Sequence, residues 1–141
     1  MSSGFTLPEL ATVVAVVGVV ASVVVPPLGR TLDRAAVEEG VQRFAAAHAT
    51  ARELAIVRGA LARLEIDRTA HTATVSVQRG AGTWDSVATY QLGTAQISCS
   101  NPVMVFNPIG LGYGVSNTRL VFSRGAAADT VTTSRTGRLR R

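Results

Sequence analysis

The sequence predicts an α+β protein in which one long N-terminal helix packs against a small antiparallel β-sheet domain. Three observations predict this class: an uncharged apolar run that begins close to the N-terminus, a helical spacing of apolar residues after it, and a change to alternating apolar and polar residues after Gly59. The 141 residues leave room for one membrane-length helix and one domain of roughly 100 residues.

The first part of the predicted helix is an apolar segment long enough to cross a membrane. No residue from Leu10 to Leu28 is charged. At about 1.5 Å per residue this segment forms a helix of roughly 28 Å, close to the ~30 Å hydrocarbon core of a bilayer. Glu9 stands at its start, and a carboxylate at the centre of a membrane helix costs about 2.5–3.5 kcal/mol, less near the interface. We therefore expect a cationic partner for Glu9, which an α-amine freed between Gly4 and Phe5 would provide.

The second part of the helix is predicted to be amphipathic. Six residues recur at spacings of four, three, four, three and four, which places them on one helix face: Val37, Val41, Phe44, His48, Ala51 and Ala55. Gly59 is a natural stop after this pattern. We predict one helix from about Leu7 to Arg58, with Pro26, Pro27 and Gly29 loosening it where it leaves the membrane.

The residues after Gly59 are predicted to form short strands separated by turns. The strand candidates, in chain order, are residues 61–66, 74–77, 84–92, 97–99, 103–106, 118–123, 130–134 and 138–140. Residues 107–116 contain three glycines and a proline and are predicted to be a loop, and residues 125–129 the turn of a hairpin. The amphipathic half of the helix is the expected cover for the apolar face of the sheet.

The residue types give no support for an enzyme. Two histidines, His48 and His71, and the single Cys99 do not make a metal-ligand cluster. No G-x-S-x-G nucleophile motif is present, and the glycines of residues 107–116 lack the lysine of a phosphate-binding loop. We expect His48 to be a packed or half-exposed residue of the helix face and Cys99 a small half-buried side chain. The prediction is a non-enzymatic protein with no cofactor and no metal.

The positive charge is concentrated at the C-terminal end. Residues 1–111 contain eight arginines and eight acidic residues, whereas residues 112–141 contain six arginines and one aspartate and so carry the whole net charge of +5. The six are Arg119, Arg124, Arg135, Arg138, Arg140 and Arg141. In an extended strand Arg138 and Arg140 point to the same face about 6.6 Å apart. That spacing is near the ~6.8 Å rise of two nucleotides, so both can contact one phosphate backbone.

The N-terminal segment, GFTLPELATVVAVVGVVASVVVPP, resembles the signature of type IV pilins and their pseudopilin relatives. The resemblance implies that a prepilin peptidase removes residues 1–4 as a leader by cutting between Gly4 and Phe5, and methylates Phe5. It also implies that Glu9 pairs with the terminal amine of a neighbouring subunit during filament assembly. The alternatives are an uncleaved single-pass anchor and an ordinary secretory signal peptide, although the basic n-region of the latter is missing.

The resemblance divides the chain into a transmembrane and filament-core helix at residues 5–28 and a globular pilin domain at residues 29–141. Three downstream motifs resemble the GspH/FimT family of minor pseudopilins and minor pilins: Ala51-Arg52-Glu53-Leu54-Ala55, Phe106-Asn107-Pro108 followed by Gly110, and Gly137-Arg138-Leu139-Arg140. Members are structural subunits of type II secretion pseudopili or type IV pili. The implied partners are other pilin subunits, the prepilin peptidase and the bacterial inner membrane, with the globular domain outside the cytoplasm and later in the pilus.

The resemblance leaves a second function open. In FimT-like minor pilins a C-terminal glycine-arginine-x-arginine element belongs to a surface that binds double-stranded DNA for uptake in natural transformation. That role would fall on Gly137, Arg138 and Arg140, with Arg135 and Arg141 as helpers. No aromatic residue lies between Arg135 and Arg141, so such binding is expected to be independent of base sequence. The other interpretations are that the basic end is solvated or contacts an acidic partner subunit.

Overall fold

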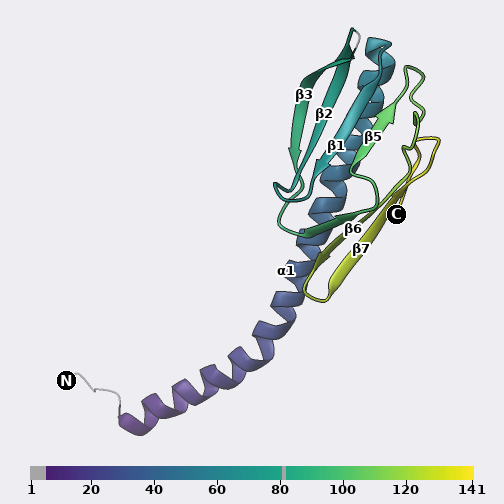
Figure 1. The fold of residues 1–141 in the computed structure, drawn as a ribbon. Helices are drawn as coiled ribbons and strands as arrows, with labels where there is room; N and C mark the ends of the chain where they lie inside the picture. The colour runs from purple at the N-terminus through teal and green to yellow at the C-terminus, as the bar shows by residue number, and fades with distance from the viewer. Residues whose placement is uncertain (1–5, 81) are drawn as a thin grey trace. The chain divides into compact units, whose positions relative to one another are not determined.

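The computed structural model describes residues 6–80 and 82–141. Gly4 and Phe5, the predicted processing site, lie outside the described residues. The chain divides into two compact units, Met1–Leu32 and Asp33–Arg141. The element order is one helix followed by eight strands among the described residues (Figure 1), which confirms the predicted α+β class.

The helix α1 spans Leu7–Arg58, the bounds that the sequence predicts. The helix is continuous through Pro26 and Pro27, so the two prolines do not end it. In the first unit an 18-residue window has a mean hydropathy of 2.3 with none of its residues buried, so by length and composition this helix can cross a membrane. Leu10 and Val13 are typical of the exposed aliphatic residues here.

In the second unit, α1 contributes one face to the core. All six residues of the predicted apolar face are buried, which confirms the helical spacing: Val37, Val41, Phe44, His48, Ala51 and Ala55. The Phe44 ring packs 6.4 Å from the ring of Phe122, measured between centroids. Gly40 permits this close approach, because a Cβ there would lie 2.7 Å from Cδ1 of Phe122 and 3.0 Å from the carbonyl oxygen of Leu92.

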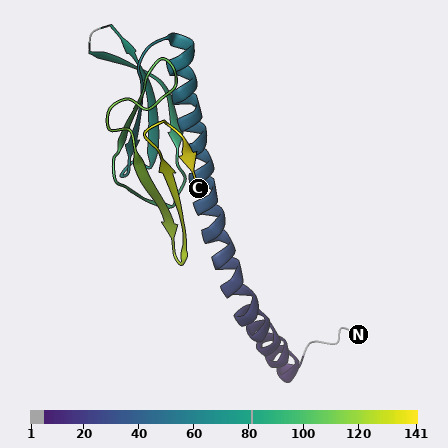
Figure 2. The same ribbon diagram turned by 90° about the vertical axis from the view of Figure 1, so that its right-hand side faces the viewer.

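The strands form two antiparallel sheets, where the sequence predicted one. The first has the order β3-β2-β1-β5, and its strands are β1 (Ala62–Asp67), β2 (Thr72–Arg79), β3 (Thr83–Gln91) and β5 (Val103–Phe106). The second has the order β4-β6-β7-β8, and its strands are β4 (Gln96–Cys99), β6 (Thr118–Arg124), β7 (Ala127–Thr133) and β8 (Leu139–Arg140). Figure 2 shows both sheets on the same side of the second part of α1.

The hairpin of β6 and β7 is tighter than predicted. Arg124 pairs with Ala127, so the turn consists of Gly125 and Ala126 rather than residues 125–129. Gly125 has a φ of +54°, which a glycine adopts without strain. A Cβ at this position would also clash with the carboxylate of Asp33. The turn was predicted to be too long because alanine is a poor strand former, yet Ala127 and Ala128 pair with residues of β6 and so belong to β7.

Candidate functional site

In the first unit, Glu9 closes the N-terminal turn of α1. Its Oε2 accepts hydrogen bonds from the backbone N–H of Thr6, at 2.8 Å, and from the Thr6 hydroxyl, at 2.7 Å. The carbonyl of Thr6 accepts the first helical hydrogen bond, from Leu10 N at 3.1 Å. Thr6 is therefore the N-cap and Glu9 the third helical residue, where a carboxylate satisfies a free amide and is favoured by the helix dipole.

In the second unit, a tight turn connects β7 to β8. Ser134 N donates to the carbonyl of Arg138 at 2.9 Å, Gly137 N donates to the carbonyl of Ser134 at 2.9 Å, and Arg138 N donates to Ser134 Oγ at 3.1 Å. Because these bonds include Arg138 in the turn, β8 begins at Leu139, one residue later than predicted. The strand therefore includes Arg140 but not Arg138, although both arginines are exposed and Leu139 between them is half-buried.

Gly137 has a structural role that explains its residue type. It is buried and has a φ of +72°, a left-handed conformation that disfavours residues with a Cβ. A Cβ would lie 3.1 Å from Cε1 of Phe106 and 3.3 Å from Gly112 N. Gly112 in turn faces the backbone of the β7–β8 turn, because a Cβ on it would lie 2.5 Å from the carbonyl oxygen of Arg135. The second and third motifs of the sequence analysis therefore lie against each other.

The six C-terminal arginines divide into two groups. Arg124 Nε lies 3.2 Å from Asp33 Oδ1, and Arg141 pairs with Asp129, Nε to Oδ2 at 2.6 Å, and with Glu38. The hydrogen bond from Arg141 lowers the pKa of the Glu38 carboxyl. Within residues 6–80 and 82–141 no carboxylate pairs with the guanidinium groups of the other four, which are exposed: Arg119, Arg135, Arg138 and Arg140. Arg141, one of the predicted helpers, is thus already engaged within its own subunit.

Arg119 is a candidate that the sequence analysis did not select. It pairs in register with Thr132 of β7, and Thr132 pairs with Arg140 of β8. The three residues are exposed and stand on one rung across three strands. At about 4.8 Å per strand, the Cα atoms of Arg119 and Arg140 are roughly 9.6 Å apart. The strand register brings the two arginines together, and it could not be read from the sequence because they are 21 residues apart in the chain.

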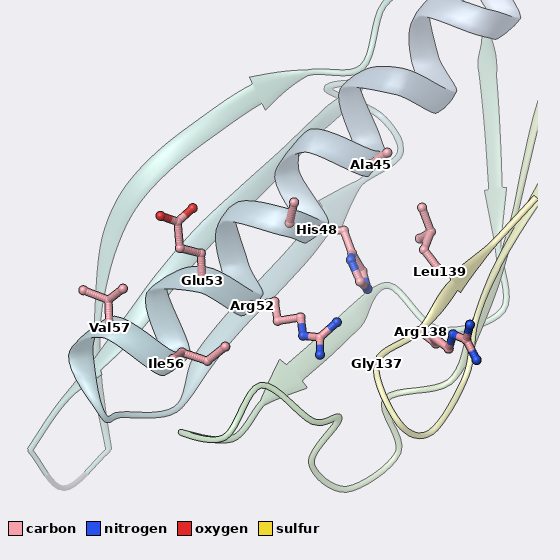
Figure 3. Close-up of a pocket in the computed structure, with 10 residues that line it drawn as sticks. Ala45, His48, Arg52, Glu53, Ile56, Val57, Gly137, Arg138 and Leu139 are labelled. Atoms are coloured by element: carbon pink, nitrogen blue, oxygen red, sulfur yellow. The ribbon is translucent and has the colours of Figure 1, made fainter.

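A groove of about 560 Å³ lies between α1 and the β7–β8 turn. We call it the helix–turn groove; residues of α1 from Ala45 to Val57 line one side, and Gly137, Arg138 and Leu139 line the other. Figure 3 shows the guanidinium groups of Arg52 and Arg138 on its two sides, with the imidazole of His48 between them. Local sequence patterns do not reveal this groove, because its two sides are about 80 residues apart in the chain.

His48 forms part of the wall of the helix–turn groove and is only 5% exposed. Its ring stands edge-on to Phe106, with centroids 5.0 Å apart. His48 is therefore packed rather than half-exposed, which is the first of the two placements expected from the sequence. Nε2 is buried without a hydrogen-bond partner among the described residues. Burial, helped by the charge of Arg52, lowers the pKa of His48 to about 4. The imidazole is therefore neutral at physiological pH.

The remaining residues with reactive side chains are scattered. Cys99 is half-buried, and burial raises the pKa of its thiol. His71 lies in the turn between β1 and β2 with a φ of 53°. Across the part of the chain that the structure describes, no three His, Cys, Asp or Glu side chains are grouped to hold a metal ion.

A long N-terminal helix followed by antiparallel sheets that pack on its second part is the type IV pilin-like fold. The structure is similar to that of the type IV minor pilin FimU of Pseudomonas aeruginosa, with a TM-score of 0.60 and 11% identity over 74% of this chain and 86% of FimU. It is also similar to the minor pseudopilin EpsH from the type 2 secretion system of Vibrio cholerae, with a TM-score of 0.61 and 18% identity over 74% of this chain and 94% of EpsH. A second crystal form of FimU gives a TM-score of 0.58 at 10% identity. No family model and no curated protein sequence matches the chain.

Proposed function

We propose that this protein is a minor pilin or pseudopilin, a non-enzymatic subunit that is anchored in the bacterial inner membrane and then assembled into a type IV pilus or a secretion pseudopilus. The observation that carries this proposal is the membrane-length apolar helix at the start of a pilin-like fold. The fold is shared with one subunit of each system, so the proposal covers both. The globular unit faces away from the cytoplasm and contacts other subunits.

The mechanism begins at the N-terminus. A prepilin peptidase removes residues 1–4 and methylates Phe5, which places a free amine four residues before Glu9. The Glu9 carboxylate, held by Thr6 in this chain, pairs with the amine of a neighbouring subunit. Pairing offsets the cost of a charge near the apolar phase, and the exposed aliphatic residues of Leu10–Val23 pack against other subunits in the filament core.

N-terminal mass spectrometry tests the first step. The full chain is expressed in a host that carries a prepilin peptidase, and the expected product begins at a Phe5 that carries one methyl group. A Gly4→Val variant is the matched control and should retain residues 1–4. Retention of the leader in the unaltered chain would contradict the proposal, as would cleavage after the apolar segment, which is where a secretory signal peptide is cut.

Four exposed C-terminal arginines pair with no carboxylate among the described residues, and this observation favours a second candidate function, sequence-independent binding of double-stranded DNA during uptake. Arg119 and Arg140 share one exposed rung, and Arg135 and Arg138 lie in the adjoining turn. Guanidinium groups suit phosphate because they donate hydrogen bonds in a planar fork. Gly137 holds the turn that presents Arg138, while Arg141 contributes less because its charge is offset by Glu38 and Asp129.

A salt-dependent DNA titration separates the two candidates. The Arg138→Ala, Arg140→Ala variant should lose binding to a duplex, whereas Arg68→Ala, Arg79→Ala, which removes the same charge from the β1–β2–β3 region, should retain most of it. Loss of transformation with intact filaments would support DNA uptake. Equal DNA binding by all three proteins would remove the second candidate and leave the secretion or scaffold role.

A further inference from the structure

We propose that the helix–turn groove binds an acidic, aliphatic peptide segment of a partner subunit, with the carboxylate of that segment held between Arg52 and Arg138. The inference rests on the proposed function as a filament subunit and adds the chemistry of the partner. It concerns a surface distinct from the outer rung of Arg119 and Arg140.

Two arginines border the groove without a counter-charge close to either guanidinium group. Arg52 and Arg138 have no ion-pair partner among the described residues, and Figure 3 shows both guanidinium groups bordering the same space. Glu53 also lines the groove but points away from both arginines in this view. Two like charges beside one cavity repel each other until an anion enters. A carboxylate is suited to this place because it can accept hydrogen bonds from both sides.

The remainder of the groove is aliphatic. Ala45, Ala49, Ile56 and Leu139 form its walls, and Ile56 is 51% exposed even though it also touches Gly110. The volume of about 560 Å³ is within the ordinary range of ligand pockets. An aliphatic side chain next to the carboxylate would cover these walls, which an inorganic anion would leave in water.

His48, which lines the groove, has a buried ring nitrogen that makes no hydrogen bond within the described residues. The side chain is 5% exposed, its Nε2 has no hydrogen-bond partner among the described residues, and its ring lines the groove. Buried polar groups without partners are rare in native proteins. Because Nε2 is buried as well as unpaired, a peptide N–H or carbonyl would bond to it only after the ring turned toward the groove, and a purely apolar ligand would offer no such bond.

The same observations disfavour nucleic acid as the occupant. Among the described residues that line the groove, His48 alone has an aromatic ring, and it is largely buried, so a base has little stacking surface. A phosphodiester backbone also has no aliphatic part to cover Ile56 and Leu139. The surface better suited to DNA is the exposed rung of Arg119 and Arg140, because neither arginine lines the helix–turn groove and both are exposed.

A peptide titration on the full chain in lipid nanodiscs tests the inference. The probe is a fluorescein-labelled Ser-Leu-Glu-Ile-Ser peptide with blocked ends, and its matched control carries Gln in place of Glu. We expect a Kd on the order of 0.1 mM for the acidic peptide and at least about tenfold weaker binding of the control. Arg52→Gln and Arg138→Gln should each weaken the acidic peptide about fivefold or more, whereas Arg140→Gln should change its affinity less than about twofold.

Two controls distinguish the loss of a binding contact from misfolding of a variant. Arg52→Lys keeps the positive charge and should retain most of the affinity, and the thermal unfolding of every variant is compared with that of the unaltered chain. Equal affinity for the Glu and Gln peptides would overturn the inference, as would acidic-peptide binding that Arg52→Gln does not weaken. Displacement of the peptide by a 20-base-pair duplex whose own binding also requires Arg52 would overturn it in favour of nucleic acid. Failure here leaves leader removal at Gly4–Phe5 intact, so it is distinguishable from failure of the proposed function.

Discussion

Lowering the pH should destabilise the globular unit through the buried imidazole of His48. The folded state holds the pKa of His48 at about 4, against an ordinary value of 6.5, chiefly because burial disfavours the charged ring and secondarily because Arg52 repels it. Between these two values the unfolded chain binds a proton that the folded unit does not. The stabilisation is therefore complete above pH 6.5 and is lost progressively as the pH falls to 4.

The magnitude follows from the size of the shift. Each pKa unit corresponds to about 1.4 kcal/mol, so the free energy of unfolding should fall by about 2 kcal/mol between pH 7.5 and pH 5 and by about 3 kcal/mol at pH 4. Because His48 is only 5% exposed, solvent screening reduces this little. The pKa values of the half-buried Glu38 and the exposed Asp67 are also lowered in the folded state. Hydrogen bonds from Arg141 lower that of Glu38, and hydrogen bonds from backbone amides of the β1–β2 turn lower that of Asp67. They too lose stabilisation in acid, but below about pH 4.5, the ordinary range of carboxylates.

The assay is urea unfolding of a fragment of residues 30–141 at several pH values between 7.5 and 4, beside the His48→Leu variant. The carboxylates contribute equally to both proteins, so the difference between their pH profiles isolates His48. That difference should amount to about 3 kcal/mol over the range. Parallel pH profiles would refute the reasoning, as would an NMR titration that places the pKa of His48 near its ordinary value.

Three further predictions concern packing and charge. Gly40→Ala should destabilise the unit by about 1–3 kcal/mol in urea unfolding although alanine favours helix, because the new Cβ overlaps Phe122; a stability gain would show that the helix can move away. Gly137→Ala should cost about 1–3 kcal/mol and, through the turn, weaken any ligand of Arg138, because of its φ of +72°; unchanged stability would show that the turn tolerates another conformation. In a DNA titration, Arg119→Ala and Arg140→Ala should each reduce the magnitude of the salt slope by about one unit, and unchanged slopes would remove the exposed rung as a phosphate contact.

Local patterns predicted the fold well where the interactions are local. The spacing from Val37 to Ala55 specified both the helix and its buried face, because every residue in the pattern contacts the same core. The left-handed Gly59 ends the helix as expected, with Ala60 N donating to the carbonyl of Ala55 at 3.3 Å. Two sheets were not predicted, because β1 pairs with β5 and β4 pairs with β6 across long stretches of sequence.

The candidate site was harder to predict from the sequence than the fold, because contacts between distant parts of the chain determine more of it. The charge count located the C-terminal arginines, but it could not separate Arg141 from Arg140. Arg141 contacts Glu38 about 100 residues earlier, whereas Arg140 pairs with no carboxylate in the part of the chain that the structure describes. Arg119 became a candidate only through the register of three strands. The helix–turn groove likewise requires Gly137 to bring its turn against Phe106 and the neighbouring helix.

The contact of Asp33 with the β6–β7 turn determines where a soluble fragment of this protein can begin. Asp33 is the first residue of the globular unit, and its carboxylate lies against Gly125 while pairing with Arg124 at 3.2 Å. A fragment that starts at Val37 would keep the apolar face of the helix but would leave the tip of the hairpin without the side chain that braces it. Cutting at residue 30 removes the apolar membrane segment and keeps that brace, so the hairpin remains fastened to the helix in solution.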